Sequence, residues 1–133
     1  FIRNHHSEGV DRLKAILGSQ QANQPTLARL RVLNTYLFML WPSDQLAEVR
    51  HIGEEAVELG RSLGDRWNTA FAMLWLGVGI TSQGDYQLAR TYLEQSLEMW
   101  QELHDVAYLG WSLVSLGEVA LLQNDYERAQ TLL

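Results

Sequence analysis

Cysteine is absent from the 133 residues, which excludes disulfides and thiolate metal sites. Lysine is nearly absent too: Lys14 is the only one, and the net charge of −6 argues against nucleic acid as a direct partner, because phosphate binding needs a basic face. No uninterrupted apolar run approaches the roughly 18–20 residues that span a bilayer, and no segment resembles a signal peptide. We therefore expect a cytoplasmic protein that contacts neither a membrane nor nucleic acid.

Catalytic motifs are also missing. The chain has no HExxH zinc motif and no glycine-rich phosphate loop, and no nucleophile motif surrounds its serines. His5, His6 and Glu8 have no matching downstream cluster, so solvated histidines are a better interpretation than a metal site. Arg50 and Glu54, four residues apart, are typical of an exposed charged helix face. We expect no catalytic residue, no metal and no cofactor, and therefore a protein that is not an enzyme.

Hydrophobic residues make up 47% of the chain, so a packed core is expected rather than disorder.

One ten-residue stretch of the sequence occurs twice in similar form. GDYQLARTYL at 84–93 returns forty positions later as NDYERAQTLL at 124–133. Sliding 65–93 onto 105–133 gives nine identities in 29 positions without a gap. A fixed period of this size is typical of a solenoid of stacked repeats.

The same register extends backwards with weaker similarity, for example at Arg50 and Arg90. We expect one helical repeat domain over 1–133, with a lead-in helix in 1–24 and repeats at about 25–64, 65–104 and 105–133, the last of them truncated. Because the chain opens on Phe1 and its last residues keep a helical pattern without a stop signal, we expect a piece of a longer protein.

Each repeat has the pattern of two helices joined by a tight turn. Gly84 suits the left-handed end of a helix, and Asp85 suits the N-cap of the next. The same two-residue signal recurs at Gly64-Asp65, His104-Asp105 and Asn124-Asp125. No segment shows strand alternation, so the fold is expected to be all-α. We expect about seven helices, near 7–17, 25–41, 44–63, 66–83, 86–103, 106–123 and 126–133.

Small residues recur where two antiparallel helices would meet. Gly77 and Ala89 can face each other across one turn, and Gly117 and Ala129 can do so across the next. Residues without bulk allow two helices to approach closely. The repeated phrase would therefore supply both the turn and the contact that closes each helix pair.

These residues resemble the tetratricopeptide repeat, in which Leu-Gly lies between bulky residues and an alanine follows the turn. The pattern is carried by Met73, Leu76, Gly77, Ile80, Ala89 and Leu93, and again by Leu113, Leu116, Gly117, Ala120, Ala129 and Leu133. The first repeat departs from it at Leu37 and Val49, where glycine and alanine are usual. The resemblance implies a superhelix of antiparallel helix pairs.

The common repeat has about 34 residues, so the longer spacing implies longer helices. This variant resembles the repeats of large bacterial regulators that join an NTPase switch of the NB-ARC or maltose-activator type to a repeat domain. The lead-in from His5 to Leu17 is similar to the helix that precedes those repeats. The resemblance implies a non-catalytic sensor or scaffold segment in signalling or transcriptional regulation. A stand-alone peptide-binding adaptor or an oligomerisation scaffold is the alternative.

In this family the first helix of each pair lines a concave surface. The resemblance implies that a protein, peptide or small effector would bind there to Arg31, Asn34, Phe38, Trp41, Phe71, Trp75, Val78, Trp111 and Glu118. The competing interpretation is that these aromatics fill a tight superhelix, since helix 71–80 is apolar nearly all round. Other domains of the parent protein are further expected partners. The uncapped helix ending at Leu133 is expected to expose apolar surface and to allow self-association.

Overall fold

The computed structural model describes the backbone of residues 2–18, 25–40 and 45–132, and within these ranges the side chains from residue 8 to residue 124, apart from residue 17. The described residues form six helices: α1 (Ile2–Leu17), α2 (Leu27–Leu40), α3 (Leu46–Leu63), α4 (Arg66–Gln83), α5 (Tyr86–Leu103) and α6 (Val106–Leu132). No strand occurs in this part of the chain. The all-α helical repeat fold expected from the sequence is confirmed.

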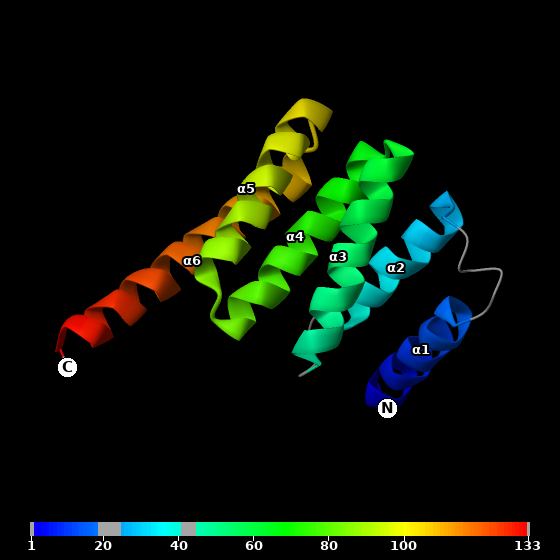
Figure 1. Cartoon of the computed structure of the whole chain (residues 1–133), viewed down its shortest axis with the longest axis horizontal. Coiled ribbons are helices and arrows are strands. Elements are labelled where there is room, and N and C mark those ends of the chain that lie inside the picture. The colour runs from blue at the N-terminus through cyan, green and yellow to red at the C-terminus, as the bar shows by residue number, and fades with distance from the viewer. Residues whose placement is uncertain (1, 19–24, 41–44, 133) are drawn as a thin grey trace.

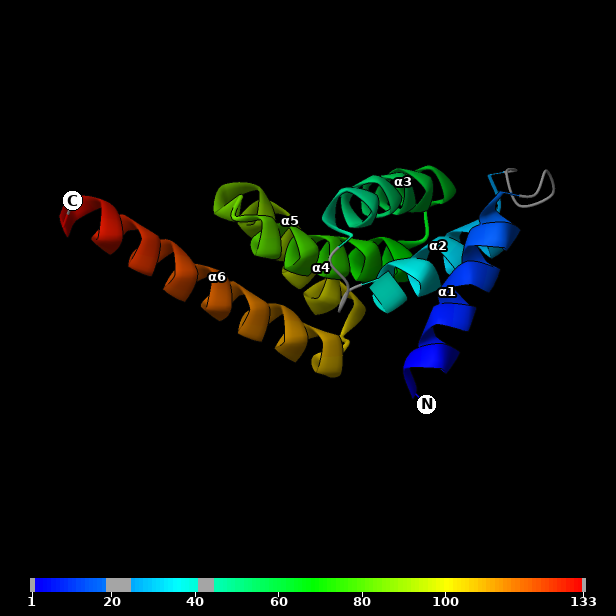
Figure 2. The same cartoon turned by 90° about the horizontal axis from the view of Figure 1, so that it is seen from below.

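The helices stack in chain order and form two layers. α4 packs between α3 and α5, α6 packs against α5, and α1 packs against α2 (Figure 1). Seen after a turn of 90°, α3 and α5 lie on one side of the stack and α2, α4 and α6 on the other (Figure 2). α4 also contacts α2 and α6 directly. We call α2, α4 and α6 the inner layer, and α3 and α5 the outer layer.

The turns between the helices have the predicted chemistry. Gly64, Gly84 and His104 end their helices in the left-handed conformation, with φ of 68°, 86° and 56°. The carboxylates of Asp65 and Asp85 cap the following helices, accepting hydrogen bonds from backbone N–H groups at 3.0 Å and 3.3 Å. Because both ends carry such local signals, the helices predicted at 66–83 and 86–103 have the predicted bounds.

α4 is buried on nearly every side, as its apolar sequence predicts. Met73 and Ile80 are 3% and 0% exposed and belong to the main core. The predicted contact between Gly77 and Ala89 is present, since a Cβ atom on Gly77 would lie 3.4 Å from the carbonyl oxygen of Ala89. α4 and α5 are therefore closed against each other by small residues.

The predicted turn at Asn124-Asp125 is wrong, because α6 continues through it from Val106 to Leu132. A positive φ costs more for Asn124 than for Gly84, and although His104 adopts one, a non-glycine residue at this position permits a turn without requiring it. A turn would also break i→i−4 hydrogen bonds that the continuous helix keeps. The predicted contact of Gly117 with Ala129 is absent: both lie on one helix, about 18 Å apart along its axis.

α6 has a long segment that is apolar on average although it contains no long uninterrupted apolar run. By length and composition alone, Val106–Asn124 could cross a membrane, a property that core helices of soluble proteins share. Glycines and serines interrupt its apolar residues, yet its mean hydropathy is 1.3. Only 17% of the segment is buried, so α6 exposes much of its apolar surface.

Candidate functional site

The inner layer holds a pocket of about 420 Å³, with walls from α2, α4 and α6. Phe38 comes from α2, Trp75 from α4, and both Tyr108 and Trp111 from α6, so each helix of the layer contributes at least one aromatic side chain. The pocket is lined by Phe38, Leu74, Trp75, Val78, Tyr108, Trp111, Val114, Ser115 and Glu118. We call this surface the aromatic groove.

The aromatic groove has a buried floor and an exposed rim. Trp75 is only 8% exposed, whereas Phe38 is 49% and Trp111 56% exposed. The rings of Phe38 and Trp75 meet edge to face, with centroids 5.0 Å apart, and Trp111 lies 6.2 Å from Trp75. Trp75 thus serves as core and as pocket wall, while the rim aromatics remain available to a partner.

A second hollow of about 420 Å³ adjoins the groove at the start of α4. It is lined by Arg31, Asn34, Thr35, Trp67, Asn68 and Phe71. Phe71 joins the two hollows, since its ring lies 6.5 Å from that of Phe38 and 6.2 Å from that of Trp75. Trp67 stacks on Phe71 at 5.4 Å. An aromatic surface therefore runs along the inner layer from Trp67 to Trp111.

The amide of Asn34 fixes α2 to the start of α4. Asn34 is 4% exposed, and its Nδ2 donates to the carbonyl oxygen of Asn68 at 3.0 Å and to Asn68 Oδ1 at 3.1 Å. Asn68 Nδ2 in turn donates to Asp65 Oδ2 at 3.0 Å. These contacts commit the side chain of Asn34 to positioning two inner-layer helices against each other.

Comparison with protein families identifies the second half of the chain. Residues 68–133 match the family model of the tetratricopeptide repeat. The match supports a tetratricopeptide repeat in this segment. No curated protein and no solved structure is significantly similar to the chain. Tetratricopeptide repeats generally mediate protein–protein interactions and are typically non-catalytic scaffolds, so the matched segment supports a role in binding a protein partner.

The structure places most of the residues expected at the concave surface in the two hollows. Phe38, Trp75, Val78, Trp111 and Glu118 line the aromatic groove. Arg31, Asn34 and Phe71 line the second hollow. Trp41 lies outside the described residues.

Thr35, Leu74, Val114 and Ser115 line these hollows from the same helix faces as the expected residues. Three further lining residues lie outside the expected stretches of those faces, namely Trp67, Asn68 and Tyr108. All three lie in the first turn of α4 or α6. Trp67 and Tyr108 also touch each other, with ring centroids 5.4 Å apart. Extending each predicted stripe back by one helical turn, three or four residues, would have included Trp67 and Tyr108.

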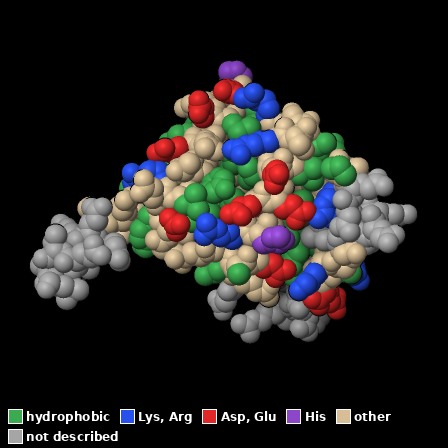
Figure 3. All heavy atoms as spheres, in the orientation of Figure 1, with side chains coloured by type: hydrophobic (Ala, Val, Ile, Leu, Met, Phe, Trp, Pro, Cys, Tyr) green, Lys and Arg blue, Asp and Glu red, His purple; other side chains and the backbone are tan. Residues whose placement is uncertain are grey.

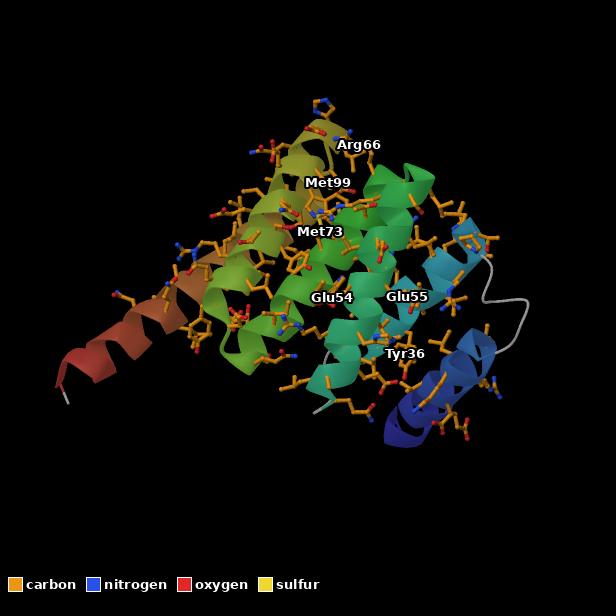
Figure 4. All side chains as sticks on the ribbon, viewed as in Figure 1. Tyr36, Glu54, Glu55, Arg66, Met73 and Met99 are labelled. Carbon is orange, nitrogen blue, oxygen red and sulfur yellow. The ribbon has the colours of Figure 1, made fainter. Side chains whose placement is uncertain are left out.

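The outer layer has a different hollow, of about 480 Å³, where α3 and α5 meet the start of α4. Met73 and Met99 lie between α4 and α5, with Arg66 at the upper end (Figure 4). Two of its charged groups already have partners: Arg66 pairs with Glu102, and Arg61 donates to Gln95 at 3.2 Å. Acidic and basic side chains are mixed over this face (Figure 3). This hollow therefore offers fewer uncommitted anchors than the aromatic groove.

Two tyrosines outside the groove have raised pKa values. Burial, followed by the hydrogen bond that its hydroxyl donates to Glu48, raises the pKa of Tyr36. Burial, followed by the nearby Glu54 carboxylate, raises the pKa of Tyr92. Lys14 Nζ lies 3.9 Å from Glu48 Oε1, so Tyr36, Glu48 and Lys14 connect α1, α2 and α3. This cluster has a structural role, since it joins the lead-in helix to the repeats.

Proposed function

We propose that the chain is a non-catalytic recognition module that binds a protein segment in the aromatic groove. The observation that supports this most directly is the exposure of Phe38 and Trp111 over the buried Trp75. Large aromatic side chains that stay half exposed in a monomer are typical anchors for a partner, because their burial on binding removes apolar surface from water. A purely structural role accounts for Trp75 but not for the exposed rim.

The wider proposal is that this module is the sensor or scaffold segment of a bacterial, cytoplasmic, multidomain signalling or transcriptional regulator. The forty-residue period supports it, as does the packing of α1 on α2, where a lead-in helix would join the repeats to preceding domains. A stand-alone peptide-binding adaptor is the alternative. A phosphate-binding loop encoded upstream of this segment would favour the regulator, and its absence from the full gene would favour the adaptor.

The binding proposal can be tested by selecting peptides from a random phage-displayed library on the purified chain. The affinities of selected peptides would then be measured by fluorescence anisotropy for the chain and for Phe38→Ala, Trp111→Ala and Leu63→Ala. Leu63 is a matched control, because it is 40% exposed but lies at the end of α3 in the outer layer.

We expect the two groove variants to bind at least about tenfold more weakly, the loss typical of a hot-spot side chain, and Leu63→Ala to bind normally. Selected peptides that bind Phe38→Ala and Trp111→Ala as tightly as the original chain would contradict the proposal. Circular dichroism would show whether each variant keeps its helices.

We also propose self-association through the exposed face of α6, with a second copy of the chain as the occupant. Leu113 and Leu121 are 51% and 69% exposed, and among the described residues no atom of another helix lies within 4 Å of a Cβ built on Gly117. In α4 the position equivalent to Gly117 is Gly77, which is covered by Leu93 of α5. The forty-residue counterpart of Ala89, whose carbonyl oxygen also lies against Gly77, is Ala129, which α6 carries past its own Gly117 in a helical extension. Two antiparallel copies of α6 would bring each extension onto the open face of the other.

Light scattering across a range of protein concentrations tests this second proposal. We expect a concentration-dependent dimer that Leu121→Asp abolishes. Leu63→Asp is the control, since Leu63 is 40% exposed but lies at the end of α3 in the outer layer, away from α6. A chain that stays monomeric at every concentration would contradict the proposal.

A further inference from the structure

We infer that the aromatic groove recognises a positively charged side chain, arginine or lysine, presented by the protein partner. This inference rests on the proposed binding function and specifies the chemistry of the ligand. It is carried by the combination of four aromatic rings and one carboxylate in the same pocket.

The aromatic rings supply the first part of such a site. Phe38, Trp75, Tyr108 and Trp111 come from three helices and line one pocket of about 420 Å³. The faces of aromatic rings carry negative electrostatic potential and attract ammonium and guanidinium groups. Trp75 is held edge to face against Phe38, so its orientation does not depend on the ligand. The pocket is therefore preformed for a group that combines apolar methylenes with a cationic head.

Glu118 supplies the second part. Of the described residues that line the groove, Glu118 is the one that carries a charge, and none is basic. Trp111, Ser115 and Glu118 are spaced by four and three residues, so they lie on one face of α6. A cationic side chain lying along this face could place its methylenes on Trp111 and its charge near the carboxylate. The arrangement favours a cation over an anion at this end of the groove.

An uncharged aliphatic ligand would fit the pocket less well. Such a ligand would remove water molecules that hydrogen-bond to the Glu118 carboxylate and would offer no hydrogen bond or charge in exchange. Burying an unpaired charge in this way is costly. Arg31, in the neighbouring hollow, lies on α2 two helical turns before Phe38 and so stands at the opposite end of the aromatic surface. The surface thus has a basic end and an acidic end, and a cation is favoured at the α6 end.

Four acetylated alanine pentapeptides with different central residues test the inference. The central residue would be arginine, its neutral isostere citrulline, lysine, or norleucine, the uncharged analogue of lysine. Binding would be measured by calorimetry to the chain, to Glu118→Gln and to Glu94→Gln. Glu94 is a matched control, since it is also an exposed glutamate but lies on α5 in the outer layer.

We expect the arginine and lysine peptides to bind about three- to tenfold more tightly than their neutral counterparts, a difference typical of one partly exposed cation–π and ionic contact. Glu118→Gln should remove this preference and Glu94→Gln should keep it. Equal or tighter binding of the neutral peptides would overturn the inference, as would failure of all four to bind. A charge preference that survives in Glu118→Gln would also overturn it, since attraction to the net negative chain would then explain the data. The proposed function would still stand if library-selected peptides depended on Trp111.

Discussion

Gly77 of α4 lies directly against Leu93 of α5, so closely that a Cβ atom on Gly77 would come within 2.7 Å of Leu93 Cγ. Leu93 is fully buried and belongs to the core, so its side chain has little room to move away. Gly117, forty residues later, has the opposite surroundings: nothing lies within 4 Å of its Cβ position. A side chain added at Gly77 would therefore clash with the core, whereas one added at Gly117 would not.

This contrast predicts opposite effects of one substitution. Gly77→Ala should destabilise the fold by about 1–3 kcal/mol, the usual cost of overpacking a core. Gly117→Ala should stabilise it by about 0.5–1 kcal/mol, because alanine is a better helix former and meets no neighbour. Urea unfolding followed by circular dichroism would give both values. Similar effects at the two sites would show that α4 and α5 are less tightly closed than the structure indicates.

Trp100 and Trp111 differ in burial, so their substitution distinguishes a core residue from a residue of the proposed binding surface. Trp100 is fully buried and stacks on Tyr108 at 4.9 Å, whereas Trp111 is 56% exposed. Trp100→Ala should lower the free energy of unfolding by about 3–5 kcal/mol, as is usual for a large aromatic in a core. Trp111→Ala should lower it by less than about 1 kcal/mol, since partly exposed side chains contribute little to the core. Thermal denaturation of the original chain and of the two variants would measure both losses of stability. A loss at Trp111 as large as at Trp100 would favour the interpretation that the rim aromatics are structural.

A buried hydroxyl pair joins α5 to α6. The Oγ atoms of Ser96 and Ser112 lie 2.9 Å apart, both residues are fully buried, and Ser96 also donates to the carbonyl oxygen of Leu93 at 2.8 Å. Each single Ser→Ala change should cost about 1–2 kcal/mol, because it leaves the other hydroxyl without this partner. The double variant should cost about 0.5–1.5 kcal/mol less than the sum of the two. Strict additivity in the double-mutant cycle would mean that the two hydroxyls do not interact.

The raised pKa of Tyr36 predicts a loss of stability at alkaline pH. Below its usual pKa of 10.0 the phenol is protonated in both the folded and the unfolded chain. Above that pH the unfolded chain releases the proton while the folded chain retains it, so the free energy of unfolding falls as pH rises. Tyr36→Phe should remove part of this slope. Urea unfolding at several values from pH 9 upwards would measure it, and an unchanged slope in Tyr36→Phe would contradict the prediction.

Local signals explain which parts of the fold the sequence could predict. The bounds of α4 and α5 follow from aspartate caps and left-handed helix ends, features that lie within a few residues of each boundary. Asn124-Asp125 carries a similar local signal, but its outcome depends on whether a following helix can pack. Since asparagine is tolerated in a helix better than glycine, packing decides, and α6 continues.

The candidate site was also predictable in part from the sequence and in part determined by packing. The resemblance to the tetratricopeptide repeat predicted that Phe38, Trp75 and Trp111 face inward, and the structure brings them into one pocket. Periodicity could not show where along each helix the hollow would begin. That depends on how successive helix pairs rotate against one another, and this rotation brings Tyr108 of α6 and Trp67 of α4 to the surface.

The central position of α4 also has a consequence for motion. α4 packs against α2, α3, α5 and α6, whereas α1 packs against α2 and reaches α3 through the Lys14–Glu48 ion pair. In a stack where each helix is held chiefly by its neighbours, the ends open more readily than the middle. The backbone amides of α4 should therefore exchange with deuterium last, and those of α1 and the far end of α6 first. A partner that bridges Phe38 on α2 and Trp111 on α6 would slow exchange on both sides of α4, including in helices it never touches.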